Sequence, residues 1–166
     1  MSNFQLAQLN VGVPLGEPES PVMAEFMANL DRINALAESS PGFVWRLQTD
    51  DGNATALRPF GDNTLVNMSV WEDVSSLSAF VFRSAHVEIM RRRKEWFERI
   101  PQAYLVLWWV ARDHRPTVTE AIERLERLRA FGPTPAAFTF RQAFTAPDAR
   151  EPGLPFAFGG DRCPAT

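Results

Sequence analysis

The chain has 166 residues, of which 45% are hydrophobic and 22% charged, a balance that is ordinary for one globular domain with its own core. Its formal net charge of −3 argues against a nucleic-acid-binding protein, because such proteins present a basic face. The chain has no apolar run of roughly eighteen residues and no secretory signal pattern, so we expect a cytoplasmic protein that contacts no membrane.

The first two predicted strands flank a helix. Residues 4–11 combine apolar and polar positions as a strand does. Ser20 is a suitable N-cap and Pro21 suits the first helical position, so an amphipathic helix is expected to start there and to end before Pro41. Residues 42–48 predict the second strand.

Two further strands with a helical stretch between them follow in the sequence. The polar stretch 50–63 predicts a hairpin-type connection to a third strand at residues 65–71. A helical pattern follows and runs to about Ile100, with an allowed break near Ser84, before a fourth strand at residues 103–110. The order β-α-β-β-α-β predicts an α+β protein of the ferredoxin-like type, with an antiparallel sheet and both helices on one face.

The C-terminal part predicts one more helix and an extended end. Thr117 begins a capping box that opens this helix, and Gly132 is a candidate to close it. In the proline-rich remainder, residues 137–144 are the one segment that suits pairing as an extended edge. We therefore expect one domain over residues 1–146 and a flexible tail over residues 147–166.

The two faces of the predicted sheet differ in composition. One face is aliphatic and suits the side that the helices cover. Its members in the first and third strands are Ala7, Leu9, Val11, Val66, Met68 and Val70. The opposite face mixes large rings with the polar side chains of Gln8, Asn10, Asn67 and Ser69. A face of this kind is too apolar for open water and too polar for a dry core.

Aromatic side chains are abundant, with thirteen Phe and five Trp against one Tyr, and rings in this number need a dense core or a lined cavity. Closing the mixed face against the sheet of a second copy would enclose a cavity with a few polar groups, which is the composition of a ligand site. We therefore predict a homodimer that binds a hydrophobic or aromatic small molecule. The alternative is a monomer in which the tail or the third helix covers this face.

Three stretches carry a resemblance to a known family. Residues 69–99 read SVWEDVSSLSAFVFRSAHVEIMRRRKEWFER, residues 40–48 read SPGFVWRLQ, and residues 132–144 read GPTPAAFTFRQAF. Together with LAQLNV near the start, they resemble the DUF3291 family, a domain of unknown function, from about residue 4 to residue 145. This family is placed with the dimeric α/β barrels, the superfamily that contains the antibiotic-biosynthesis monooxygenases. The resemblance implies a fold and a homodimer more than a reaction.

His86 is the first candidate for chemistry, because imidazole titrates near neutrality and also ligates haem iron. Haem-degrading monooxygenases of this superfamily use an Asn, a Trp and a His from the same three elements. The resemblance therefore implies Asn10, Trp71 and His86 as catalytic residues, with His86 as a metal ligand only if haem is bound. The alternative is a core histidine whose ring nitrogens are satisfied by neighbouring groups.

Cofactor-independent monooxygenases of the same fold imply a second version, in which the substrate supplies the electrons and Asn10, Asn67 and Trp71 position it. In either version we expect Gln8, Asn67 and Trp108 to line the ligand cavity. Arg46 is expected to hold a carboxylate or phenolate, and its alternative is a solvent-facing position.

The cofactor is therefore either haem or none, and three functions follow. The first is a monooxygenase-type oxidoreductase that acts on an aromatic or polycyclic molecule. The second is a protein that binds a hydrophobic small molecule without catalysis, and the third is a lyase or isomerase with His86 as general base. The basic run at residues 91–94 predicts a solvated, salt-bridged helix face, because Glu88, Glu95 and Glu98 lie within pairing distance.

Overall fold

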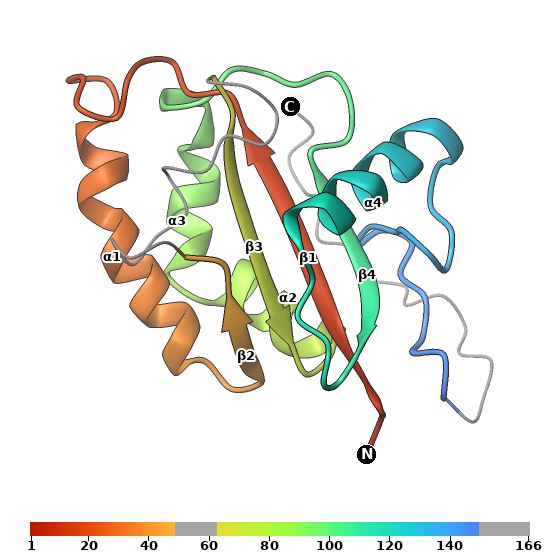
Figure 1. Ribbon diagram of the computed structural model, residues 1–166. Coiled ribbons are helices and arrows are strands. Elements are labelled where there is room, and N and C mark those ends of the chain that lie inside the picture. The colour runs from red at the N-terminus through yellow and green to blue at the C-terminus, as the bar shows by residue number, and fades with distance from the viewer. Residues whose placement is uncertain (49–62, 150–166) are drawn as a thin grey trace.

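One antiparallel sheet organises the molecule, whose computed structural model describes residues 1–48 and 63–149. Its strands are β1 (Phe4–Gly12), β2 (Phe43–Arg46), β3 (Leu65–Trp71) and β4 (Leu105–Ala111). They lie side by side in the order β2-β3-β1-β4, so β3 and β1 are the central strands and β2 and β4 form the edges (Figure 1). This order confirms the predicted ferredoxin-like α+β fold.

Helices cover both faces of the sheet. They are α1 (Ala24–Ser39), α2 (Val74–Arg83), α3 (His86–Arg91), the short 3-10 turn η1 (Arg93–Glu95) and α4 (Val118–Phe131). Figure 1 shows α4 in front of β1 and β4, with α2 and α3 behind the sheet. The helix predicted after the fourth strand thus packs on the opposite face from the helices that precede that strand.

The predicted ends of α4 are confirmed. The hydroxyl of Thr117 accepts a hydrogen bond from the backbone N–H of Glu120 at 3.1 Å, which satisfies one free donor of the first turn. Gly132 follows the last turn with φ of 73°, a conformation that glycine adopts without a Cβ clash. The carboxylate of Glu120 does not return to the cap, because it accepts from Trp108 Nε1 at 2.9 Å instead.

The helical stretch after β3 is shorter and more broken than predicted. It breaks at Ser84, whose hydroxyl donates to the Phe80 carbonyl and accepts from the His86 N–H, replacing helix hydrogen bonds with side-chain ones. The stretch then ends with η1 at Glu95, before Ile100.

Two further boundaries differ from the prediction. Helix α1 starts at Ala24, after a turn that contains Ser20 and Pro21. In the 137–144 segment Phe138 exchanges backbone hydrogen bonds with Leu107 of β4, both at 2.8 Å, so this segment makes a single bridge to the sheet and does not add a strand to it.

The aliphatic face of the sheet packs against α4. The buried side chains on this face are Ala7, Leu9, Val11, Val66, Met68, Val70, Val106, Trp108 and Val110, and they form one core with Ala121, Leu125 and Leu128 of α4. The mixed face is covered by α1, α2 and α3. We predicted that these earlier helices cover the aliphatic face, and that prediction is wrong. Alternation along the strands was identified correctly, but α4 carries the aliphatic stripe that matches the aliphatic face, while the earlier helices bring rings and polar groups.

Parts of the prediction lie outside the described residues. These are almost all of the hairpin at 50–63 and the tail beyond Ala149. The homodimer and the division into a domain and a tail stay predictions. Among residues 1–48 and 63–149, every helix is too short or too polar to cross a membrane.

Candidate functional site

A cavity of about 170 Å³ lies between the mixed face of the sheet and the helices α1, α2 and α3. From the sheet it is lined by Gln8, Asn10, Asn67, Ser69 and Trp71, and from the helices by residues that include Phe26, Ile33, Phe80, His86 and Ile89. Apolar walls with a few convergent polar groups are typical of small-molecule sites. The cavity forms within one chain, so the prediction that two facing sheets enclose it is wrong.

A chain of hydrogen bonds crosses the floor of the cavity from β1 to β3. Gln8 Nε2 donates to Asn67 Oδ1 at 2.7 Å and to Ser69 Oγ at 3.0 Å. Asn10 Nδ2 donates to Gln8 Oε1 at 3.2 Å and to Asn67 Oδ1 at 3.3 Å. Trp71 Nε1 donates to the same Ser69 oxygen at 2.9 Å. The antiparallel register explains the cluster, because Gln8 pairs with Ser69 and Asn10 with Asn67 across the two strands.

Two groups of this chain keep hydrogen-bonding capacity. Asn10 Oδ1 and Asn67 Nδ2 have no partner in the part of the protein that the structure describes. Asn67 is exposed and Asn10 half-buried, whereas Gln8 and Ser69 are buried. The outer members can therefore offer one acceptor and one donor to a bound molecule while the inner members hold them in place.

A column of rings forms the wall next to this floor. Trp71 stacks on Phe80 with ring centroids 5.1 Å apart, and Phe80 packs on His86 at 4.8 Å. Phe43 meets the other side of Trp71 edge-on at 5.4 Å. The structure thus brings Trp71 and His86 to one wall although fifteen residues separate them, because both rings pack on Phe80.

His86 is held in its neutral form. Burial lowers the pKa of His86 below its ordinary value of 6.5, and a hydrogen bond to the Val81 carbonyl opposes this shift. That carbonyl lies 3.4 Å from Nδ1 and can only accept, so Nδ1 carries the hydrogen of the neutral ring. Nε2 then bears a lone pair, and no described residue donates to it. His86 is therefore equipped to take a proton from a molecule in the cavity.

Arg46 lines the cavity but its charge is already paired. Its Nε donates to Glu38 Oε1 of α1 at 2.7 Å, and its side chain is 11% exposed. Arg46 is thus not the solvent-facing residue of the alternative prediction. Its predicted role as a holder of carboxylate or phenolate stays a prediction, since Glu38 competes for the same guanidinium.

Trp108 lies on the other side of the sheet. It is fully buried in the core beneath α4, and its Nε1 donates to Glu120 Oε1 at 2.9 Å. The prediction that Trp108 lines the ligand cavity is therefore corrected. Residues alternate between faces along a strand, so an assignment of the wrong face to β4 moved Trp108 into the site.

Sequence analysis missed Arg93. The run at residues 91–94 was interpreted as a solvated face, and Arg92 fits that interpretation because it contacts Glu25 and Glu95. Arg93 instead turns inward, lines the cavity, and lies over the rings of Phe97 and Tyr104. The signal available in the sequence was the two aromatic residues near a basic run.

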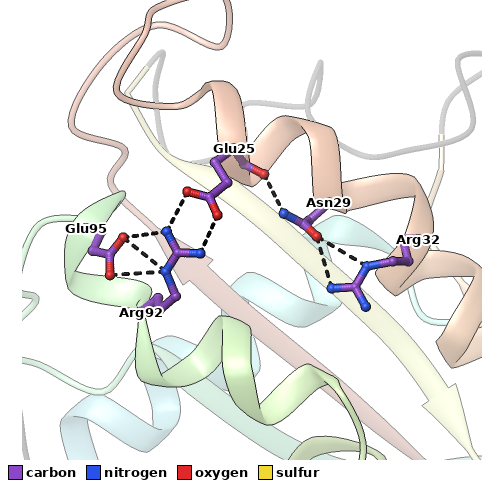
Figure 2. A network of polar contacts seen from close by, with 5 residues as sticks. All are labelled: Glu25, Asn29, Arg32, Arg92 and Glu95. Carbon is purple, nitrogen blue, oxygen red and sulfur yellow. Dashed lines mark hydrogen bonds and ion pairs between the residues drawn. The ribbon is translucent and has the colours of Figure 1, made fainter.

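Charged residues also connect the helices on two sides of the cavity. Figure 2 shows Arg92, next to α3, between Glu25 of α1 and Glu95 of η1, while Asn29 and Arg32 extend the network along α1. Asn29 lines the cavity, so this network lies beside it. It attaches α1 to the segment that carries His86 and Arg93.

Haem does not fit this cavity. Its volume of about 170 Å³ lies below the roughly 300–1,000 Å³ of pockets that hold drug-sized ligands, and a haem is larger than most of these. The ring of His86 is also packed against Phe80 on one side. Within the described residues no group of three or more His, Cys, Asp or Glu side chains is placed to hold a metal ion.

Comparison with known proteins identifies one family and several similar folds. The model of DUF3291, a domain of unknown function, matches residues 5–153. No curated protein matches. Among solved structures, SnoaB, a cofactor-independent oxygenase from Streptomyces nogalater, is 18% identical with a TM-score of 0.45, covering 69% of this chain and 96% of its own. A candidate antibiotic biosynthesis monooxygenase from Nitrosomonas europaea is 12% identical with a TM-score of 0.45, covering 70% and 97%. Rv0793 from Mycobacterium tuberculosis is 15% identical with a TM-score of 0.43, covering 68% and 99%.

Proposed function

Because the chain belongs to the DUF3291 family, a domain of unknown function, its activity has to be inferred from the cavity, and we propose a cofactor-independent monooxygenase that acts on a compact aromatic molecule. The observation that carries the proposal is the hydrogen-bonded chain from Asn10 to Trp71 within a cavity of aromatic walls, next to a neutral histidine. This arrangement supports three roles in one small space, namely orienting the substrate, accepting its proton and stabilising the resulting anion.

The reaction needs a substrate that forms a carbanion. A ring CH₂ group made acidic by a neighbouring carbonyl loses a proton, and the carbanion passes electrons to O₂. One oxygen atom replaces the two hydrogens as a new carbonyl and the other leaves as water, so R₂CH₂ and O₂ give R₂C=O and H₂O. The substrate supplies every electron. The protein supplies position, a proton acceptor and electrostatic stabilisation.

Each role has a candidate residue. His86 takes the proton at Nε2, since Nδ1 is directed to the Val81 carbonyl. The free Nδ2 of Asn67 donates to the oxygen that becomes negative as the carbanion forms, and Gln8 holds the Asn67 side chain through its Oδ1. Trp71 borders the cavity and holds Ser69 in the polar chain, because its indole N–H donates to the Ser69 hydroxyl.

The proposal is tested with anthrone as a probe, in metal-free buffer without added cofactor. We expect uptake of one O₂ for each anthraquinone formed, no hydrogen peroxide, and one ¹⁸O atom in the product when ¹⁸O₂ is supplied. Removing the base in His86→Ala should lower kcat by about a hundredfold or more. Asn67→Ala should lower it by a similar factor, as loss of an oxyanion donor does elsewhere.

A matched pair of variants controls for simple unfolding. Trp71→Phe removes an indole from the cavity wall, whereas Trp108→Phe removes one from the opposite face of the same sheet. We expect the first to impair turnover and the second to leave it unchanged in the folded protein. Anthrone recovered unchanged from a stable complex would replace the proposal with a non-catalytic binding protein.

The neutral state of His86 favours one further candidate. A lyase or isomerase uses the same proton acceptor without oxygen. Exchange of the anthrone CH₂ protons with ²H₂O under nitrogen, with no O₂ uptake when air is admitted, would favour this class over the monooxygenase.

A further inference from the structure

The inward arginine of the basic run has an unusual environment. The guanidinium carbon of Arg93 lies 4.9 Å from the ring centroid of Phe97 and 4.6 Å from that of Tyr104. Its Nη2 donates to the Val11 carbonyl of β1 at 3.0 Å. Gly12 leaves room for the Phe97 ring on which Arg93 packs, because a Cβ there would lie 2.7 Å from that ring. Packing thus holds the Arg93 head group at the wall of the cavity.

Arg93 lines the cavity without an acidic partner, unlike Arg92 and Arg46. Arg92 pairs with Glu25 and Glu95, and Arg46 pairs with Glu38. No Asp or Glu within the described ranges forms an ion pair with Arg93, and one backbone carbonyl uses a single one of its several N–H donors. The cavity wall therefore contains a positive charge that no acidic side chain among residues 1–48 and 63–149 pairs with.

Such a charge favours an anion in the cavity. Burial lowers the pKa of Arg93, which shows that its surroundings oppose the charged form, yet an arginine stays protonated in proteins. A partly desolvated cation gains more from an opposite charge than an exposed one, and a guanidinium matches a carboxylate with two parallel hydrogen bonds. The two aromatic rings limit the directions from which such a group can approach.

The position of Arg93 relative to the rest of the site indicates how a bound ligand would be oriented. Val11 lies toward the C-terminal end of β1, while Trp71 pairs with Leu6 near the start of the same strand. Arg93 and Trp71 therefore lie at opposite ends of the polar floor. A ligand that reaches Arg93 with one group can place its rings beside Asn10 and Asn67, in the direction of Trp71.

We propose that Arg93 binds an acidic group of the ligand, so that the cavity selects aromatic molecules with a carboxylate or an ionised phenol over their neutral analogues. This inference deepens the proposed function by naming the class of its substrate. Only the statement that the ligand is a substrate rests on the proposed function, since the inference itself concerns binding.

Binding of two matched probes tests the inference. Naphthalene-2-carboxylate and naphthalene-2-carboxamide share one ring system and differ in charge, and calorimetry at pH 7.5 gives the Kd of each. We expect the wild-type protein to bind the carboxylate at least tenfold more tightly, with an advantage that shrinks as salt is added. Arg93→Gln should weaken carboxylate binding by about tenfold to a hundredfold and change carboxamide binding by less than threefold.

Two more variants separate charge from packing. Arg93→Lys retains the charge without the planar head group and should keep part of the preference for the carboxylate. Arg91→Gln removes a nearby exposed charge that does not line the cavity and should leave both Kd values unchanged. Circular dichroism confirms that each variant is folded, and the wild-type comparison holds even if one of them is not.

The inference is wrong if the wild-type protein binds both probes equally or binds neither, or if Arg93→Gln weakens both to the same extent. Failure of the proposed function has a different signature, because a charge-selective cavity that binds an anthrone carboxylate and leaves it unoxidised would retain the role of Arg93 while excluding the oxygenase.

Discussion

Alternate residues of the same strands build two unlike surfaces on the sheet. Leu9 and Met68 point into a dry core beneath α4, while their neighbours Gln8 and Asn67 face a cavity and bond to each other at 2.7 Å. The side chains of the first surface are packed against apolar neighbours in one buried cluster. The second keeps an open space and a buried polar chain, neither of which maximises stability. The contrast assigns the candidate ligand site to the second surface, where Leu6, Trp71 and Leu107 also belong to a buried apolar cluster with α2.

The largest expected effect is a difference in the free energy of unfolding between variants on the two faces of the sheet. Trp108→Ala should lower the free energy of unfolding by about 3–5 kcal/mol, because it leaves a void in close-packed surroundings. Trp71→Ala should cost less, since the Trp71 ring already borders the cavity on one side. Urea denaturation of both variants measures the difference. A Trp71→Ala cost equal to or above that of Trp108→Ala would remove the distinction between the faces.

A second prediction concerns the energetic coupling between the hydrogen-bonded residues of the cavity floor. Gln8→Leu should lower the free energy of unfolding by about 1–3 kcal/mol, because Asn67 and Ser69 lose their shared buried donor. The double variant Gln8→Leu/Asn67→Leu should cost less than the sum of the two single changes, as expected for residues of one network. Additive costs in this double-mutant cycle would show that the chain of hydrogen bonds does not act as a unit.

The smallest effect is a pH dependence. The pKa of His86 is lowered in the folded protein, so the unfolded chain binds more protons between that pKa and 6.5. The contribution of neutral His86 to stability is therefore complete above pH 6.5 and is lost as the pH falls through this interval. The wild-type protein should lose more stability than His86→Leu between pH 7 and pH 5. Parallel curves in thermal denaturation would contradict the buried, neutral histidine.

Local chemistry made much of the fold predictable. The strand pattern, the capping at Thr117 and the conformation of Gly132 depend on neighbouring residues, and each was recognisable from a few letters. The site residues on β1 and β3 were also recognisable, because strand alternation places Gln8 and Asn10 on one face and Asn67 and Trp71 on the matching face.

Tertiary choices were not predictable in the same way. Alternation shows that two faces differ but not which face a given helix covers, so Trp108 was assigned to the cavity and the cavity to a subunit boundary. The orientation of Arg93 depends on the angle at which the chain turns from α3 into η1, an angle that adjacent arginines in a sequence do not reveal. The break at Ser84 was expected, although the packing of His86 on Phe80 was not.

The contacts of Arg92 with Glu25 and Glu95 have a consequence for ligand exchange (Figure 2). Exposed ion pairs are weak, and added salt weakens them further. Separating α1 from α3 therefore disturbs water-accessible charges together with the packing of Phe26 on Trp96 and Phe97, whereas separating α4 from the sheet exposes the larger apolar core. Breathing motions of the molecule should concentrate at the α1 side, and dissolved salt should quicken the entry and escape of whatever occupies the interior.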